Sequence, residues 1–437
     1  MRRAWRRARG LGGQFGVAAA ATLAALAGGF VNQLVASAVF GMGAGLDVYV
    51  ATNAITNVAI AAVGGVCGAA LATRAAEGED HRDRHVADVA VPLLAFGALG
   101  VALAALAGPA GRVLVPQAFR SDPGLVRLVL WLNLAGMVPN VAATAAAAIV
   151  VGRGKTVLGV ASPMIVSVGG VMGALVFGER AGVAALAAGT MAGSALRLVV
   201  LLLAMPVRLP RVSTLLDSAG FWIGSAGLMA SSAVVAAVSV ADKVALAPFD
   251  AGTVSHTAYA MMLLTSAGTV MSSGLGAPLA RRFAKSSGGG RWEHAARATR
   301  IGTLFLTPVA LLVLVAAEPI AGVLLEWGRV RHADVLDIAR AARLGGGVIL
   351  FVGLSAVTTY FAGRGRGGLV LSATSAGALA GVSVFFGARG LLGSAAVPVG
   401  YSVMYATIAA ICLAAFVVEG GHREEPRLRQ LEEGTAS

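Results

Sequence analysis

The chain repeatedly presents apolar runs of about 20 residues, each long enough to cross the hydrocarbon core of a bilayer. Only 13% of its residues are charged and its mean hydropathy is +0.81, values that exclude an ordinary soluble domain. We therefore predict an all-α, multi-pass protein of the cytoplasmic (inner) membrane. About twelve spans are predicted, near residues 14–40, 48–72, 87–107, 124–150, 156–178, 181–205, 219–247, 254–279, 298–323, 338–362, 367–388 and 393–418.

The second half of the chain repeats short signatures of the first half in the same order. Val151-Gly152-Arg153-Gly154-Lys155 corresponds to Ala362-Gly363-Arg364-Gly365-Arg366, and Phe40-Gly41-Met42-Gly43 corresponds to Phe249-Asp250-Ala251-Gly252. Several ordered matches indicate a duplicated half, and duplicated membrane-spanning halves are typical of transporters. We predict an N-terminal lobe at 1–205, a linker at 206–217, a C-terminal lobe at 218–418 and a tail at 419–437. Six spans in each lobe give both lobes the same orientation.

The net charge of +13 is concentrated in alternate short loops, a distribution that argues against a nucleic-acid partner. If both termini are cytoplasmic, the inner segments hold about 23 Lys and Arg and the outer ones about 9, as the positive-inside rule requires. We expect Arg153, Lys155, Arg364 and Arg366 to anchor two tight cytoplasmic turns. The alternative is that these turns attract an anionic headgroup that enters from inside.

Polar side chains within the spans are the candidate functional residues, because burial in lipid is costly without a partner or water. The candidates for lining a central cavity are Asn32, Gln33, Asp47, Asn53, Asn57, Arg197, Asp242 and Lys243. Asn133 and Asn140 lie in the fourth span. The repeat aligns Gln33 with Asp242, which would place them on opposite walls of one cavity.

Each candidate also has a purely structural interpretation. Asn53 and Asn57 share one helix face and would serve as interhelical hydrogen-bonding groups. Lys243 would extend toward the membrane surface while Asp242 pairs elsewhere. Arg197, about 12 Å from the inner end of its span, would do the same.

Catalytic and metal-binding patterns are missing from the sequence. Cys67 and Cys412 lie within apolar runs, the six histidines are scattered, and no ATP-binding loop is recognisable. We expect a non-enzymatic transporter without cofactors, driven by the substrate gradient, the membrane potential or a coupling ion (H⁺ or Na⁺) that the sequence does not specify.

The order of several motifs resembles the MurJ (MviN) family of lipid II flippases, within the MOP superfamily. The motifs are Phe40-Gly41-Met42-Gly43 with Asp47, Tyr49 and Ala51, then Ile55-Thr56-Asn57, Asp242-Lys243, Leu325-Glu326-Trp327-Gly328-Arg329 and Tyr360-Phe361-Ala362-Gly363-Arg364. The resemblance implies two six-helix lobes of the kind also found in MATE transporters. It further implies alternating access, a lipid-linked saccharide as substrate and membrane lipid as the other partner.

The chain also departs from that family. Where the family carries cavity arginines that are thought to hold a diphosphate, this sequence has Leu26, Asn32, Ile60 and Met262. It also shows twelve spans where the family has fourteen. Three functions stay open: a flippase for a polyprenyl-diphosphate-linked cell-wall precursor such as lipid II, an ion-coupled MATE-like exporter of an amphipathic small molecule or natural product, and a non-transporting paralogue. In the exporter, Asp242 would serve the coupling ion.

Overall fold

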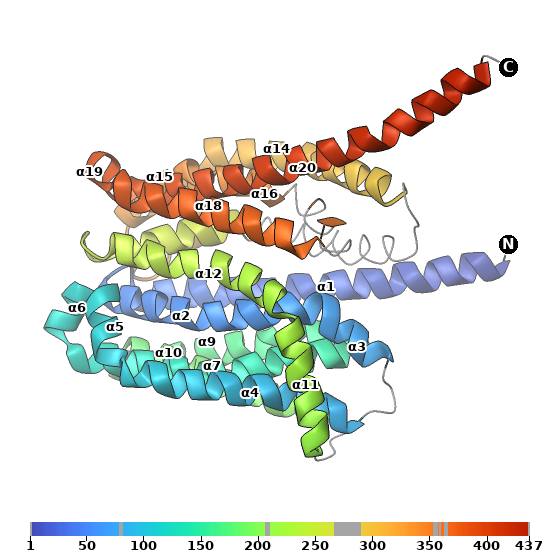
Figure 1. Cartoon of the computed structure of the whole chain (residues 1–437). Helices are drawn as coiled ribbons and strands as arrows, with labels where there is room; N and C mark the ends of the chain where they lie inside the picture. The colour runs from blue at the N-terminus through green and yellow to red at the C-terminus, as the bar shows by residue number, and fades with distance from the viewer. Residues whose placement is uncertain are drawn as a thin grey trace. The chain divides into compact units, whose positions relative to one another are not determined.

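A computed structural model describes the backbone of residues 2–77, 82–205, 210–265, 290–352, 357, 360–361 and 366–435, and most of their side chains (Figure 1). Every described element is a helix, as predicted. The chain packs into two compact units. Unit 1 comprises Met1–Tyr259 with Glu318–Ala339, and unit 2 comprises Ala260–Ala317 with Arg340–Ser437.

The helices of unit 1 follow one another with short connections. They are α1 (Arg2–Phe40), α2 (Ala44–Val66), a π-helix (Cys67–Leu71), α3 (Ala72–Glu77), α4 (Arg82–Ala105), α5 (Ala107–Leu114), α6 (Pro116–Ser121), α7 (Pro123–Gly152), α8 (Thr156–Ala161), α9 (Pro163–Ala181), α10 (Val183–Leu203), α11 (Val212–Gly224) and α12 (Ala226–Leu246). The end of α14 and the start of α15 also belong to this unit.

Unit 2 is built from the remaining helices. They are α14 (Gly290–Leu325), α15 (His332–Leu344), α16 (Gly347–Val352), α18 (Gly367–Gly387), α19 (Arg389–Leu392), a 3₁₀ turn (Gly393–Ala395) and α20 (Ala396–Thr435). Its main packing pair is α18 against α20.

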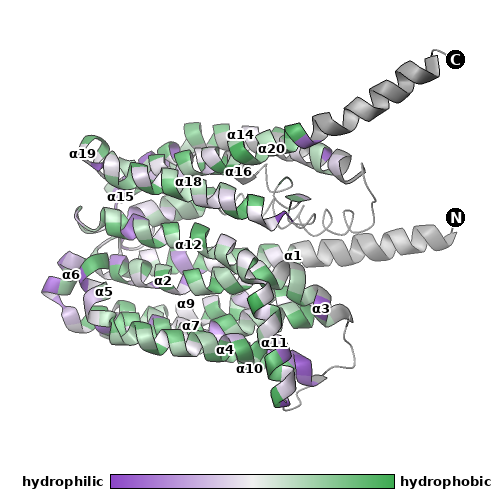
Figure 2. Ribbon diagram, viewed as in Figure 1, coloured by the Kyte–Doolittle hydropathy of each residue, from purple (hydrophilic) through white to green (hydrophobic). Residues whose placement is uncertain are grey.

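Nine helices in the described part are long and apolar enough to cross a membrane. They coincide with nine predicted spans: Ala20–Phe40, Ala44–Val66, Asp83–Ala105, Pro123–Gly152, Thr156–Ala181, Val183–Leu203, Ala226–Leu246, Gly367–Gly387 and Arg389–Glu419. Of the other three predicted spans, 254–279 and 338–362 include residues outside the described part, whereas 298–323 lies within α14 (Gly290–Leu325). Figure 2 shows hydrophilic residues of unit 1 gathered mostly near α6 at one end of its long helices and near α3 and α11 at the other.

Helix α7 lies at the centre of unit 1, packed against α2, α4 and α10. Its second half is a run of small residues, and Ala142, Ala143, Ala145 and Ala146 are fully buried. Small side chains let neighbouring helices approach closely in a membrane, where apolar burial alone does not favour association. By contrast, Leu94 and Val101 of α4 are exposed, as expected of residues that face lipid.

Helices α9 and α10 form a hairpin whose contact surface is glycine. A Cβ atom placed on Gly169 or Gly173 would collide with the carbonyl oxygen of Gly189 or Ala185, and one on Gly189 would collide with that of Gly169. Because all three obstacles are backbone atoms, the two helices tolerate no larger residue at these positions without separating.

The first of the two basic segments is a tight turn between α7 and α8. Gly154 has φ of +87°, a conformation that favours glycine, and its N–H donates to the Val151 carbonyl at 3.0 Å. Lys155 Nζ donates to the Ala204 carbonyl just beyond α10, at 2.9 Å. In the second copy Arg364 lies outside the described residues, and Arg366 donates its backbone N–H to Phe361 O at 3.0 Å. The cytoplasmic position of both turns stays a prediction.

Helix α11 runs crosswise to α4 (Figure 1). Charged and polar side chains bind it to α3 and α4 of the same unit. Asp217 accepts hydrogen bonds from Arg84 Nη2 at 2.8 Å and Arg74 Nη2 at 3.0 Å. Ser218 Oγ donates to the buried Asp88 carboxylate at 2.7 Å. This helix begins within the predicted linker. The lobe boundaries predicted from the repeat stay predictions. The two units are defined by packing contacts and not by the repeated sequence, so they do not test those boundaries.

Candidate functional site: a polar cavity in unit 1

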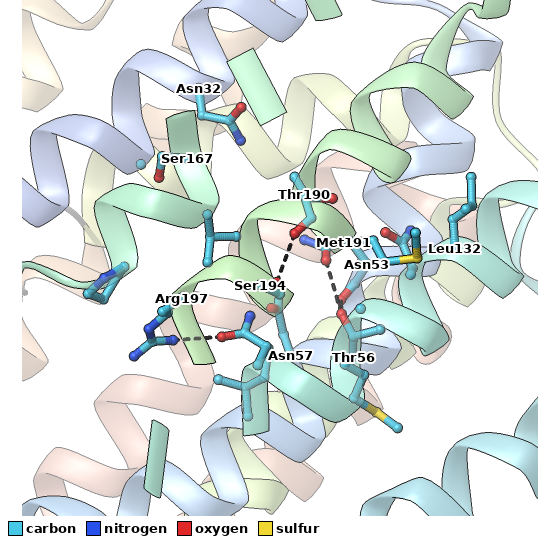
Figure 3. A pocket seen from close by; sticks show the side chains of 18 of the residues that line it. Asn32, Asn53, Thr56, Asn57, Leu132, Ser167, Thr190, Met191, Ser194 and Arg197 are labelled. Carbon is cyan, nitrogen blue, oxygen red and sulfur yellow. Dashed lines mark hydrogen bonds between the residues drawn. The ribbon is translucent and has the colours of Figure 1, made fainter. Parts of the chain in front are cut away.

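A cavity of about 530 Å³ lies among five helices of unit 1, α1, α2, α7, α9 and α10 (Figure 3). Its polar lining consists of Asn32, Gln33, Asn53, Thr56, Asn57, Asn133, Asn140, Thr144, Ser167, Thr190, Ser194 and Arg197, together with Tyr49. Five of the eight residues predicted to line a cavity are therefore brought together here: Asn32, Gln33, Asn53, Asn57 and Arg197.

The two asparagines of α2 face this cavity. Asn57 is exposed, and Asn53 Oδ1 accepts a hydrogen bond from Thr56 Oγ1 of the same helix at 3.0 Å. The bond that joins α2 to α7 comes instead from Asn133, whose Nδ2 donates to Thr52 Oγ1 at 2.8 Å. Interhelical bonding therefore falls to Asn133, and the two α2 amides present polar groups to the cavity.

Helix α1 contributes Asn32 and Gln33. The Asn32 side chain is buried, with 8% of the residue exposed, and its Oδ1 has no hydrogen-bond partner within the described part of the chain. The main-chain oxygen of Gln33 accepts from the Tyr259 hydroxyl at 2.6 Å. Asn32 and Ile60, two positions at which the family resemblance implies arginine, both line the cavity.

Arg197 of α10 is directed into the bundle. Only 6% of the residue is exposed. Its Nη1 donates to Asn140 Oδ1 on α7 at 2.6 Å, and its Nε donates to Ser162 Oγ, at the start of α9, at 3.1 Å. Ser162 Oγ in turn donates to the Gly159 carbonyl at 2.9 Å, which leaves the oxygen oriented to accept from Arg197. Two residues from different segments thus hold the guanidinium that α10 carries.

The cavity carries one formal positive charge and no negative charge on its described lining. Arg197 is its one lining residue with a charged side chain, since no aspartate or glutamate is among those that the structure places there. Both hydrogen-bond partners of Arg197 are neutral. A site of this composition suits an anionic group accompanied by neutral hydroxyl or amide groups.

Asp47 lies elsewhere, at the first turn of α2. Its carboxylate accepts hydrogen bonds from Gly252 N at 2.6 Å, Ser255 N at 2.8 Å and Ser255 Oγ at 2.6 Å. It thereby caps the helical turn that follows Gly252, satisfying main-chain donors that an isolated helix leaves open.

Asp242 and Lys243 of α12 are also outside the lining of this cavity. Both are buried, and Lys243 Nζ lies 2.8 Å from Asp242 Oδ1. The structural interpretation had Lys243 extend toward the membrane surface while Asp242 pairs elsewhere, although adjacent helix residues point only about 100° apart. The long lysine side chain spans that separation, and the two charges pair.

Sequence reasoning missed the hydroxyl groups of this site. Ser162 supports Arg197, and Thr190 and Ser194 line the same wall of α10. The sequence did contain a signal for these hydroxyl groups. Thr190, Ser194 and Arg197 follow helical spacing and therefore share one face of the helix. In the described part of the chain no cluster of three His, Cys, Asp or Glu is placed to hold a metal.

Comparisons with known proteins show which family and which solved structures this chain resembles. The sequence matches the family described as "Lipid II flippase MurJ" over residues 143–388, more than half of the chain. A search of curated proteins finds no significant match. Among solved structures, the chain is similar to a lipid II flippase MurJ in an inward closed conformation, with a TM-score of 0.74 and 14% identity, covering 91% of this chain and 87% of that one.

Two further solved structures share the fold. A MATE transporter from Vibrio cholerae in a bent form has a TM-score of 0.64 and 15% identity, covering 93% of this chain and 96% of that one. A MOP superfamily transporter from Pyrococcus furiosus, noted for the reverse polarity of its binding pocket, has a TM-score of 0.58 and 17% identity, with 96% of each chain covered. From the family match and the helical membrane architecture together, this chain is a multi-pass inner-membrane protein that belongs to the MurJ family of lipid II flippases.

Proposed function

We propose that this protein translocates a polyprenyl-diphosphate-linked cell-wall precursor such as lipid II across the cytoplasmic membrane by alternating access. Family membership already makes it a membrane transporter of the flippase type. The observation that carries the specific proposal is the cavity in unit 1, which is rich in amides, holds the Arg197 guanidinium and has no described carboxylate in its lining.

The physical problem for such a substrate is its headgroup. Charged and hydroxyl groups lose their water if they cross about 30 Å of hydrocarbon, and this desolvation is prohibitive without partners. Asparagine side chains offer both a donor and an acceptor, which matches sugar hydroxyls and peptide amides. A polar cavity between membrane helices therefore lowers the barrier for the headgroup while the polyprenyl chain stays in lipid.

Complementation tests this proposal. The endogenous lipid II flippase of a host is depleted while this protein is expressed at a verified level. We expect growth rescue, and loss of rescue with Asn57→Ala, because that amide faces the cavity. Arg180→Gln, at an exposed position of α9, is the matched control and should rescue fully. No rescue, combined with no lipid II translocation in vesicles that contain the protein, would exclude lipid II as the substrate.

An ion-coupled exporter of an amphipathic small molecule is the second candidate. Its support is the shared fold with MATE transporters. Such an exporter needs an ionisable group for H⁺ or Na⁺, and Asp242 is the candidate from the sequence. Its pairing with Lys243 makes it less suited to that role, because the carboxylate already has a cationic partner. Reduced drug accumulation in an efflux-deficient host, abolished by Asp242→Asn, would favour this function over the first.

A further inference from the structure

We propose that Arg197 is the binding residue for a phosphate oxyanion in the cavity of unit 1. Asn140 and Ser162 position its guanidinium, and the exposed amide of Asn57 hydrogen-bonds neutral hydroxyl or amide groups of the same ligand. This inference rests on the proposed function and assigns the residues that recognise the headgroup.

Lys243 and Arg74, two other basic residues of unit 1 with little exposure, each have a carboxylate beside them. Lys243 pairs with Asp242 at 2.8 Å, and Arg74 lies 3.0 Å from Asp217 and 3.4 Å from Asp88. Arg197 differs, because no carboxylate of the described residues lies within 4 Å of it and its hydrogen-bond partners are an amide and a hydroxyl. A buried charge without a counter-charge is unfavourable, so its retention points to an anion that arrives from outside.

The geometry leaves part of the guanidinium available. Nε and Nη1 each donate to one protein oxygen, and Nη2 has no acceptor within the described part of the chain. Nη2 is also absent from the fully enclosed polar atoms without partners, so it is accessible from the cavity. Arginine presents a planar fork of donors that matches phosphate oxygens, and the two protein contacts fix the plane of that fork.

The neutral part of the lining supplies a second observation. Asn57 is exposed and, like Asn53, presents its side-chain amide to the cavity, where it offers a donor and an acceptor to a ligand. The cavity therefore recognises a ligand with an oxyanion and with hydroxyl or amide groups, as in a phosphorylated saccharide. An organic cation would be repelled by the Arg197 charge.

The test uses the purified full-length protein in detergent and measures binding and thermal unfolding. The probes are inorganic pyrophosphate, a polyprenyl diphosphate, and the corresponding neutral polyprenol. We expect Arg197→Gln to weaken binding of the phosphorylated probe by about 10-fold or more, since a hydrogen bond to a charged group is lost. Arg197→Lys keeps the charge without the fork and should recover part of the affinity. Arg180→Gln should bind as the unmodified protein does.

The outcomes separate the sources of the phosphate and the two proposals. Binding of pyrophosphate alone would assign the site to a free anion, and binding of the polyprenyl diphosphate alone would assign it to a lipid headgroup. Equal binding of neutral polyprenol, or unchanged affinity in Arg197→Gln with unfolding still normal, would overturn the site. If phosphate binding depends on Arg197 but complementation fails, the site stands and lipid II is excluded. If Arg197→Gln still complements, the site is overturned and the flippase function stands.

Discussion

Asp47 and Arg197 are both buried and charged, and both lie in unit 1, yet their surroundings contrast. The Asp47 carboxylate receives three hydrogen bonds from the turn at Gly252 and Ser255. The Arg197 guanidinium makes two hydrogen bonds to neutral oxygens and borders an open polar cavity. Protein groups satisfy the first charge almost completely and the second only in part. A polar residue at depth is thus informative about function only once its partners are known.

The largest expected effect follows from removing the satisfied charge. Asp47→Ala leaves two main-chain N–H groups and one hydroxyl without their acceptor, at about 1–3 kcal/mol for each buried group. We expect a large fall in the thermal unfolding temperature in detergent, together with poor expression. Asp250→Ala, an exposed carboxylate in the same loop, is the control. An equal fall in both variants would mean that the loop, rather than the cap, is sensitive.

The next effect concerns the wall that carries Arg197. Gly189→Ala places a methyl group against the Gly169 carbonyl, where only backbone movement relieves the clash, so the α9–α10 pair should separate. We expect destabilisation of about 1–3 kcal/mol, as for other overpacked sites, measured by thermal unfolding. Gly64→Ala, where no atom lies within 4 Å, should change little. Similar unfolding temperatures for the two variants would show that α9 and α10 are not held in contact by these glycines.

Arg197→Gln should have a small effect on unfolding without ligand, and this result tests the comparison most directly. A buried charge without a counter-charge carries an uncompensated desolvation cost, which a neutral amide in its place removes. The glutamine amide still has Asn140 and Ser162 as acceptors nearby. We expect an unchanged or raised unfolding temperature together with lost substrate binding. If the unfolding temperature of Arg197→Gln fell as far as that of Asp47→Ala, Arg197 would be a structural residue and would not differ from Asp47 in its role.

The smallest effect is expected at the surface pair between α11 and α4. Hydrogen bonds from Arg84 hold the pKa of Asp217 below its ordinary value, helped by the positive charges of Arg84 and Arg74. A lowered folded-state pKa means that the stabilisation is present above the unfolded-state pKa and is lost as pH falls through the folded-state pKa. Because Asp217 is half exposed, water and salt weaken the interaction.

The matching measurement is the unfolding temperature of Asp217→Asn against the unmodified protein at several pH values. We expect a small difference near pH 7 that disappears under acidic conditions, below the ordinary pKa of an aspartate, and also at high salt. A difference that persists in acid would point to packing of α11 rather than to the ion pairs.

Nine membrane spans could be predicted from the sequence because hydrophobic length is a local property. Five cavity residues could be predicted because polar side chains within such spans are rare. The role of Asp47 could not, since its partners are mostly main-chain N–H groups more than 200 residues away, and any sequence offers those. Nor could the sequence show which helices meet at Arg197, because Ser162 and Asn140 reach it only through tertiary packing.

The π-helix at Cys67–Leu71 determines which way the side chains of α3 point relative to those of α2. The Ala72 N–H bonds to Cys67 O, five residues back, so this stretch accommodates one residue more than a regular α-turn. One additional residue rotates everything beyond it by about 100° relative to an uninterrupted helix. Asn53 and Asn57 before this offset face the cavity, whereas Arg74 after it reaches Asp88 and Asp217. Deleting a single residue here would restore a regular helix and turn Arg74 away from α11, so the length of this segment is as constrained as its composition.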